Sequence, residues 1–184
     1  RMFSYAPFAK LILDTGIDGT HPDLAGKLTG LSQFFDPNNS GARTEDNPPT
    51  PACNHATRAA GVAAASTGNN IGIAGMSWGA KLLSLKVFDN NDCAAGCQHS
   101  KCLTDDATIL AAINYAATQN NLAGIGKIII NMSLGTPDTC SGPLQAAVSS
   151  AYAAGLLLVA ASGNESSFVD SPANCANAIP VGAT

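Results

Sequence analysis

The chain of 184 residues has 46% hydrophobic and 12% charged residues, which is typical of one globular domain with a sizeable core and excludes a disordered chain. Its 13 acidic and 9 basic residues give a net charge of −4 without runs of like charge, so we expect no nucleic-acid partner and no membrane partner. Six cysteines in a chain with few lysines and glutamates indicate an oxidising compartment, and we therefore expect a secreted, extracellular protein.

The first half of the chain alternates apolar runs with irregular stretches. Residues 10–14 (KLILD) predict a strand that ends in an aspartate, and residues 81–88 (KLLSLKVF) predict another strand. Between them, residues 36–54 are rich in proline, asparagine and acidic side chains, and we expect a surface loop there. The alanine-rich stretch that follows predicts a helix, with Asn54 as its cap and His55 in its first turn.

A histidine at a helix start has three common roles. It acts as a general base, binds a metal, or lies at the surface without chemistry. Because the positive end of the helix dipole disfavours an imidazolium, we expect the ring of His55 to be largely neutral. These residues alone do not choose among the three roles.

The second half of the chain alternates helices with apolar strands. Residues 105–119 and 141–155 predict helices, and residues 127–135 and 156–164 predict strands. Such alternation predicts an α/β fold, a parallel β-sheet flanked by helices on both faces. Ligands of these sheets bind at the carboxyl ends of the strands. We expect the following residues to cluster there: Asp14, residues 133–135 and residues 162–164.

No strand is followed by a glycine-rich phosphate loop, which argues against a nucleotide-binding protein and against an organic cofactor. Five other motifs follow one another in a definite order. They are LILDTGIDGTHPDL (11–24), NHATRAAGVAAAS (54–66), GIAG (72–75), INMSLG (130–135) and VAASGNE (159–165). In sequence and spacing they resemble the subtilisin-like serine proteases, the subtilases, from about Lys10 to Thr184. The resemblance implies an endopeptidase with an Asp-His-Ser triad, polypeptide substrates, a propeptide inhibitor and a monomeric state.

The resemblance assigns roles to individual residues. Asp14 matches the triad aspartate, His55 matches the general base, and Asn164 matches the asparagine whose amide donates to the oxyanion. The backbone of Ser133, Leu134 and Gly135 matches the segment that pairs with an extended substrate peptide. The opposite wall of the first specificity pocket would consist of Ala161, Ser162 and Gly163.

The chain departs from the family pattern in two places. After the histidine the family has Gly, Thr and a second His, whereas this chain has Ala56, Thr57 and Arg58; a nearby arginine is expected to depress the pKa of His55. The serine motif of the family has no counterpart, because Ser133 and Ser162 belong to other motifs.

We therefore expect residues 1–184 to be a partial catalytic domain, truncated before the catalytic serine, with a fold that is incomplete at its C-terminal end. The alternative is a non-catalytic relative that binds peptides in the same cleft.

Two acidic residues follow the oxyanion asparagine. By the resemblance, Glu165 and Asp170 lie at the rim and floor of the first specificity pocket, so we expect some tolerance for lysine or arginine beside large apolar residues. The alternative is that both carboxylates are solvated.

The cysteines allow two interpretations. Cys93, Cys97, His99 and Cys102 offer zinc ligands, but their spacing matches none of the common structural pairs, which favours disulfides. In the family the loops that hold Cys140 and Cys175 approach each other, so these two form our preferred pair. Cys53 would then pair with one of the three loop cysteines, leaving the other two to each other.

The resemblance also implies one metal cofactor, calcium. Asp23, Asn69 and Asn70, with the carbonyls of Ile71 and Ile73, resemble a loop site that many subtilases use, and such oxygen ligands suit calcium. The alternative is an asparagine turn beside an exposed aspartate.

Overall fold

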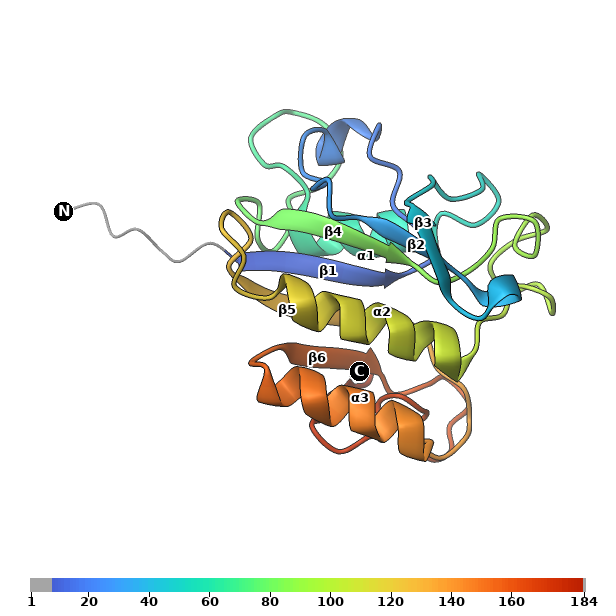
Figure 1. The fold of residues 1–184 in the computed structure, drawn as a ribbon. Helices are drawn as coiled ribbons and strands as arrows, with labels where there is room; N and C mark the ends of the chain where they lie inside the picture. Colours follow the sequence, from blue (N-terminus) through green and yellow to red (C-terminus); the bar gives the residue numbers. More distant parts are fainter. Residues whose placement is uncertain (1–7, 184) are drawn as a thin grey trace.

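The structure, a computed structural model, describes residues 8–183 and is built on one seven-stranded β-sheet (Figure 1). The strand order is β3-β2-β4-β1-β5-β6-β7, and every neighbouring pair is parallel except β2 and β3. The strands are β1 (Phe8–Asp14), β2 (Gln33–Asp36), β3 (Ala42–Glu45), β4 (Lys81–Lys86), β5 (Lys127–Met132), β6 (Leu157–Ala161) and β7 (Ala178–Val181). The α-helices are α1 (His55–Ala64), α2 (Asp106–Gln119) and α3 (Gly142–Ala153).

Helices cover both faces of the sheet, which confirms the predicted fold class. On β1, Leu11 and Leu13 point into the core shared with α2 and α3, whereas Ile12 points into the core shared with α1. The cause is the two-residue period of a strand, which sends successive side chains to opposite faces. Because both faces are buried, the strand reads as a continuous apolar run, and each fully buried leucine contributes on the order of 2 kcal/mol.

The expected surface loop over residues 36–54 is wrong in its first part. Asp36 ends β2, and residues 42–45 form β3, which pairs with β2 in an antiparallel hairpin at the sheet edge. The side chains of β3 are mostly exposed and show no apolar alternation, so its sequence (ARTE) carries no strand pattern. Backbone hydrogen bonds to β2 specify this strand.

The start of α1 also differs from the prediction. Asn54 occupies the cap position, but its side chain makes no capping bond and instead accepts from Nε of Arg58 at 3.0 Å. The N–H of Ala56, in the first helical turn, donates to Oγ1 of Thr15 at 3.1 Å. The helix is therefore capped by a hydroxyl from the end of β1, and this tertiary cap joins the two elements that carry Asp14 and His55.

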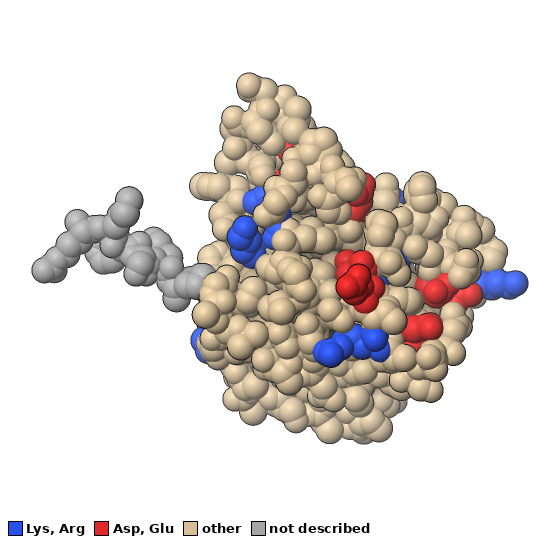
Figure 2. Space-filling view, turned by 45° about the horizontal axis from the view of Figure 1, so that its top comes forward, with Lys and Arg blue, Asp and Glu red and all other residues tan. Residues whose placement is uncertain are grey.

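Among the residues that the structure describes, β6 and β7 have exposed apolar side chains on the α1 side of the sheet. Leu158 and its register partner Ala178 pack toward α3, so the alternating residues of β6 and β7 face the other way. On that face α1 packs over β1 and β4, and three large apolar side chains farther along the sheet are exposed: Leu157, Ile179 and Val181. Charged side chains are few on the face of the molecule in Figure 2, most of which is uncharged.

Candidate active site

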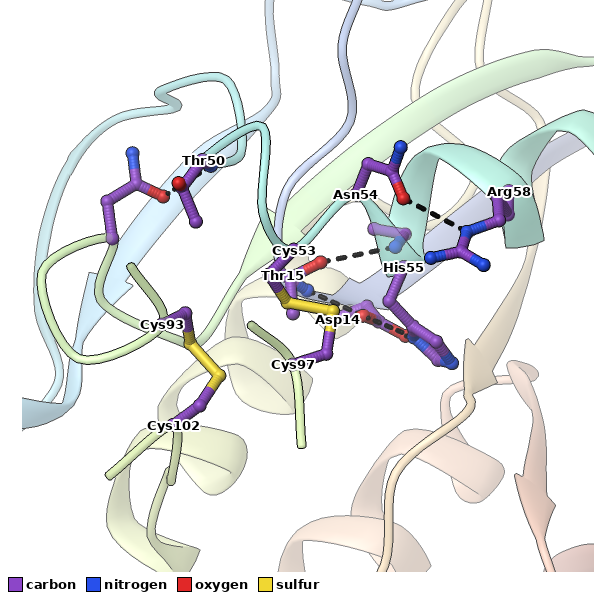
Figure 3. The surroundings of a disulfide bond; sticks show 12 residues. Asp14, Thr15, Thr50, Cys53, Asn54, His55, Arg58, Cys93, Cys97 and Cys102 are labelled. Atoms are coloured by element: carbon purple, nitrogen blue, oxygen red, sulfur yellow. Dashed lines mark hydrogen bonds and ion pairs between the residues drawn. A yellow bond between two sulfur atoms is a disulfide. The ribbon is translucent and has the colours of Figure 1, made fainter. Parts of the chain in front are cut away.

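Asp14 and His55 form a hydrogen-bonded pair at the carboxyl edge of the sheet (Figure 3). Asp14 ends β1 and is only 1% exposed, and His55, half-buried, is the first residue of α1. Nδ1 of His55 lies 2.9 Å from both carboxylate oxygens of Asp14. The backbone N–H of Thr15 donates to Oδ1 at 2.7 Å. An ionised carboxylate only accepts, so it holds the proton on Nδ1 and leaves Nε2 free to accept another.

The environment of His55 favours its protonated form. The hydrogen bond that His55 donates to Asp14 raises the pKa of His55, and it outweighs burial and the positive charge of Arg58, which both lower that pKa. Arg58 therefore acts in the predicted direction, but the net shift is opposite to the one we expected from the helix dipole. The direct contact with a carboxylate is the stronger influence because it is closer than the helix terminus as a whole.

Two disulfides stand beside this pair. Cys53 is bonded to Cys97, Cys93 to Cys102, and Cys140 to Cys175, the last as the resemblance to the subtilases implied. The sulfur atoms of three of these cysteines lie within 4.8 Å of one another, yet all are in disulfides and none is a thiolate for zinc. Figure 3 shows the Cys53–Cys97 bond next to Asp14 and His55.

The Cys53–Cys97 bond joins the residue two before His55 to the loop over residues 89–104. That loop forms one wall of a cleft of about 710 Å³, whose other lining residues include Asp14, His55 and Arg58. The tether fixes the position of the cleft wall relative to the histidine.

The predicted substrate-binding segments lie at the same edge of the sheet. Residues 133–135 follow β5, Ala161 ends β6, and residues 162–164 come next. Since β1, β5 and β6 are neighbouring parallel strands, these segments and Asp14 occur at one edge, as expected. A second cleft of about 600 Å³ is lined by Leu134 and Gly135 of the first segment and, among other residues, by Leu103 and Ile109.

The two serines of these segments have other partners. Oγ of Ser133 accepts from Nδ2 of Asn131 at 2.9 Å, and the backbone of Ser162 pairs with Val181 and Asp170. In the part of the chain that the structure describes, no serine hydroxyl forms a hydrogen bond with His55.

Asn164 is exposed on the turn after β6. Its backbone N–H donates to Oε2 of Glu165 at 2.7 Å. The preceding Gly163 adopts φ +100°, a conformation that side-chain-bearing residues rarely reach.

A carboxyl group lies between the two predicted substrate walls. Asp170 is 3% exposed, and its Oδ2 would lie 3.0 Å from a Cβ on Gly135 and 2.5 Å from one on Gly163. Burial raises the pKa of Asp170, and the neighbouring Glu165 raises it further. Oδ1 of Asp170 is buried with no hydrogen-bond partner among the described residues. Glu165, by contrast, is exposed.

The predicted calcium ligands lie near one another, but their oxygen atoms are not arranged around a common point where a cation could bind. Oδ1 of Asp23 accepts from Nδ2 of Asn69 at 2.8 Å, and Oδ2 accepts from the N–H of Ile73 at 3.0 Å. The carboxylate, 3% exposed, is thus occupied by N–H donors, and Asn70 and Ile71 lie exposed on the loop. In this arrangement the residues do not fit a calcium ion. The calcium site is a prediction from the resemblance alone.

Thr15 is the site residue that the sequence pattern did not single out. Its N–H orients Asp14 and its hydroxyl seats α1, and the second role needs a contact between segments 41 residues apart. A threonine that follows a strand-ending aspartate does not predict a contact with a distant helix.

A carboxylate–histidine pair at the carboxyl edge of a parallel sheet is the arrangement that the aspartate and histidine of α/β serine proteases adopt. The chain belongs to the Subtilase family, whose profile matches residues 11–184.

Similar proteins include a thermophilic serine proteinase from Bacillus sp. (strain AK1), 39% identical over 94% of this chain and 37% of that protein. Thermitase from Thermoactinomyces vulgaris is 37% identical over 94% of this chain and 53% of thermitase. Among solved structures, the S41 psychrophilic protease and sphericase each superpose with a TM-score of 0.74 at 32% identity. They are covered over 52% and 53% of their lengths, and this chain over 95%. The chain thus spans between about a third and about a half of these relatives.

Within residues 8–183, no helix has the length and apolar character that crossing a bilayer requires.

Proposed function

We propose that this chain is the part of a secreted serine endopeptidase that carries the triad aspartate, the triad histidine and the oxyanion asparagine. The observation that carries the proposal is the bond between Nδ1 of His55 and both oxygens of the buried Asp14. Because Nδ1 is held by Asp14, Nε2 of His55 is free to accept a proton, which is the task of the general base in peptide-bond hydrolysis.

The proposed reaction uses groups of this chain at three points. His55 takes the proton of an attacking serine hydroxyl and returns it to the leaving amine, while Asp14 stabilises the imidazolium between the two steps. The side chain of Asn164 donates to the oxyanion of the tetrahedral intermediate. The backbone of residues 133–135 pairs with the substrate peptide as an added strand.

We propose that another segment of the whole protein supplies the serine. Two observations support this: the chain spans 37% and 53% of two relatives, and the α1-side face of β6 and β7 is bare. An exposed apolar sheet face is costly in water, and a further segment packed on it would remove that cost. Secretion is supported by the three disulfides and by the relative named "Extracellular protease" from Xanthomonas campestris.

Cleavage of a denatured protein substrate by the whole protein tests the proposal. We expect cleavage by the wild type and by His21→Ala, a control histidine that contacts Asp23, and none by His55→Ala. Binding of peptide without cleavage in the wild type would instead support a non-catalytic relative that keeps the cleft.

The pH dependence of hydrolysis follows from the raised pKa of His55. The general base must be neutral, so the rate should rise with pH through a pKa above the ordinary value of 6.5. Because Arg58 lowers this pKa, Arg58→Gln should move the acid limb of kcat/KM to still higher pH.

Rate profiles between about pH 5 and pH 9 measure this shift. Arg43→Gln, which removes a charge that lies over Tyr115, is the matched control and should leave the limb in place. An acid limb that moves down in Arg58→Gln contradicts the prediction.

The acidic pair supports a second expectation, on specificity. Asp170 lies between Gly135 and Gly163, the predicted walls of the first pocket, and Glu165 lies beside it. A lysine or arginine side chain of the substrate would meet both carboxyl groups. We expect kcat/KM for these residues, relative to phenylalanine, to fall about fivefold in Asp170→Asn and in Glu165→Gln.

A peptide library cleaved by the whole protein gives these ratios. Glu45→Gln, on the exposed edge strand β3, serves as the control. If the wild type rejects basic residues as strongly as the two variants do, neither carboxyl group contributes to specificity and the expectation is wrong.

A further inference from the structure

Lys86 is a buried lysine next to the catalytic pair. It ends β4, is 1% exposed, and is the register partner of Asp14 on the neighbouring strand β1. Its Nζ donates to the carbonyl of Thr15 at 2.9 Å and to Oδ1 of Asn90 at 2.6 Å. In the described part of the chain no carboxylate forms an ion pair with this ammonium. Burial lowers the pKa of Lys86 to about 8, against the opposing influence of Asp46 and of another aspartate nearby.

Burying a lysine ammonium costs free energy unless its N–H groups are hydrogen-bonded. The two groups that accept from Lys86 therefore show which parts of the structure depend on it. The first belongs to Thr15, which uses each of its polar groups at this place. Its carbonyl accepts from Lys86, its N–H donates to Oδ1 of Asp14 at 2.7 Å, and its Oγ1 accepts from the N–H of Ala56 at 3.1 Å. One residue thus connects the ammonium to the carboxylate and to the first turn of α1.

The second acceptor connects Lys86 to the segment that leads into His55. Oδ1 of Asn90 also accepts from the N–H of Thr50 at 3.0 Å, and its Nδ2 donates to the carbonyl of Pro48 at 3.0 Å. Both of these residues precede His55 in the chain. The ammonium therefore lies where the strand end that carries Asp14 meets the approach to His55.

We propose that Lys86 is a positioning residue for the Asp14–His55 pair, acting through Thr15 and Asn90 without touching substrate. A lysine fits this position because its aliphatic side chain runs close to Gly16. A Cβ added to Gly16 would lie 3.1 Å from Cδ of Lys86. Methionine is similar in length to the aliphatic part of lysine but donates no hydrogen bond. It would leave the buried carbonyl of Thr15 without this donor, while Oδ1 of Asn90 would keep only the N–H of Thr50. The kinetic part of the test rests on the proposed function, whereas the structural part does not.

The test compares Lys86→Met with Lys27→Met in the whole protein. Lys27 is also buried, 8% exposed, and donates to the carbonyl of Trp78, away from the catalytic pair. Histidine NMR, with the signals of His55 assigned from His55→Gln, reports the pair directly. We expect Lys86→Met to lose the downfield Nδ1 proton signal and to move the pKa of His55 back toward its ordinary value, with no such change in Lys27→Met.

Asn90→Ala covers the case in which Lys86→Met does not fold. It keeps the bond from Lys86 to Thr15 and should shift the titration of His55 in the same direction, by less. The proposal is overturned if a folded Lys86→Met titrates at His55 like Lys27→Met, or, where Lys86→Met is unfolded, if Asn90→Ala leaves His55 unchanged. Thermal unfolding curves identify which variants are folded.

Kinetics separate positioning from substrate contact. We expect kcat to fall between about tenfold and a hundredfold in Lys86→Met with KM unchanged, the effect of a slightly displaced catalytic group. A raised KM at constant kcat overturns the proposal. If the wild type hydrolyses nothing, the proposed function fails, and the NMR comparison still decides the role of Lys86.

Discussion

Replacing Asp14 by asparagine is expected to lower kcat of the whole protein by about 10⁴-fold. The buried carboxylate accepts from Nδ1 of His55 at 2.9 Å, and it holds the ring proton on that nitrogen. An asparagine amide that donates to Nδ1 would instead place the ring proton on Nε2, the nitrogen that must receive the proton of the nucleophile. The substitution keeps the shape of the site, so KM should change little.

Steady-state kinetics on a peptide substrate measure this effect. Asp18→Asn is the matched control, because Asp18 lies four residues on, accepts from Thr20, and has no contact with the ring of His55. A loss of less than about tenfold in Asp14→Asn would show that the tautomer of His55 does not limit the reaction.

The second large effect concerns the nucleophile. The 184-residue chain on its own is expected to hydrolyse peptides about 10⁶-fold more slowly than the whole protein, which is the size of the loss that removal of the serine causes in subtilisin itself. The reason is geometric: Ser133 bonds to Asn131, Ser162 is held between Val181 and Asp170, and neither hydroxyl bonds to His55. A histidine activates only a hydroxyl within hydrogen-bond reach.

A fluorophosphonate probe, which labels activated serines, tests this directly. The whole protein should be labelled stoichiometrically, and the 184-residue chain should not. If the shorter chain is labelled, and the labelling disappears in His55→Ala, a serine of this chain is the nucleophile and the proposal of a separate serine segment is wrong.

The sequence determined the layers of the fold because buried parallel strands and amphipathic helices leave strong patterns. Residues 10–14, 81–88 and 127–135 are continuous apolar runs, and the structure places most of β1 and all of β4 and β5 within them. The predicted cap Asn54 makes no capping bond at α1, but Ser141, the first residue of the helix predicted over residues 141–155, accepts from the N–H of Leu144 at 3.4 Å at the start of α3. In the strands and at Ser141 the side chain that carries the pattern makes the contact itself.

The resemblance to the subtilases identified Asp14 and His55 as candidate site residues, but the pKa of His55 depends on which groups contact its ring. The helix-start position alone suggested a neutral ring, and the bond to Asp14 reversed that expectation. A direct bond to a carboxylate outweighs the dipole of a helix, and only the folded chain shows which groups touch.

What only the tertiary structure decided are the features held by partners distant in sequence. Strand β3 exists because its backbone pairs with β2, and its exposed side chains record nothing of it. The cap of α1 comes from Thr15, 41 residues away, and Lys86 is joined to Thr15 across 71 residues. A local pattern reports which face of an element is buried, whereas a hydrogen bond between distant segments depends on how the whole chain folds. The buried strands β1, β4, β5 and β6 were therefore predictable, and the residues that support the Asp14–His55 pair were not.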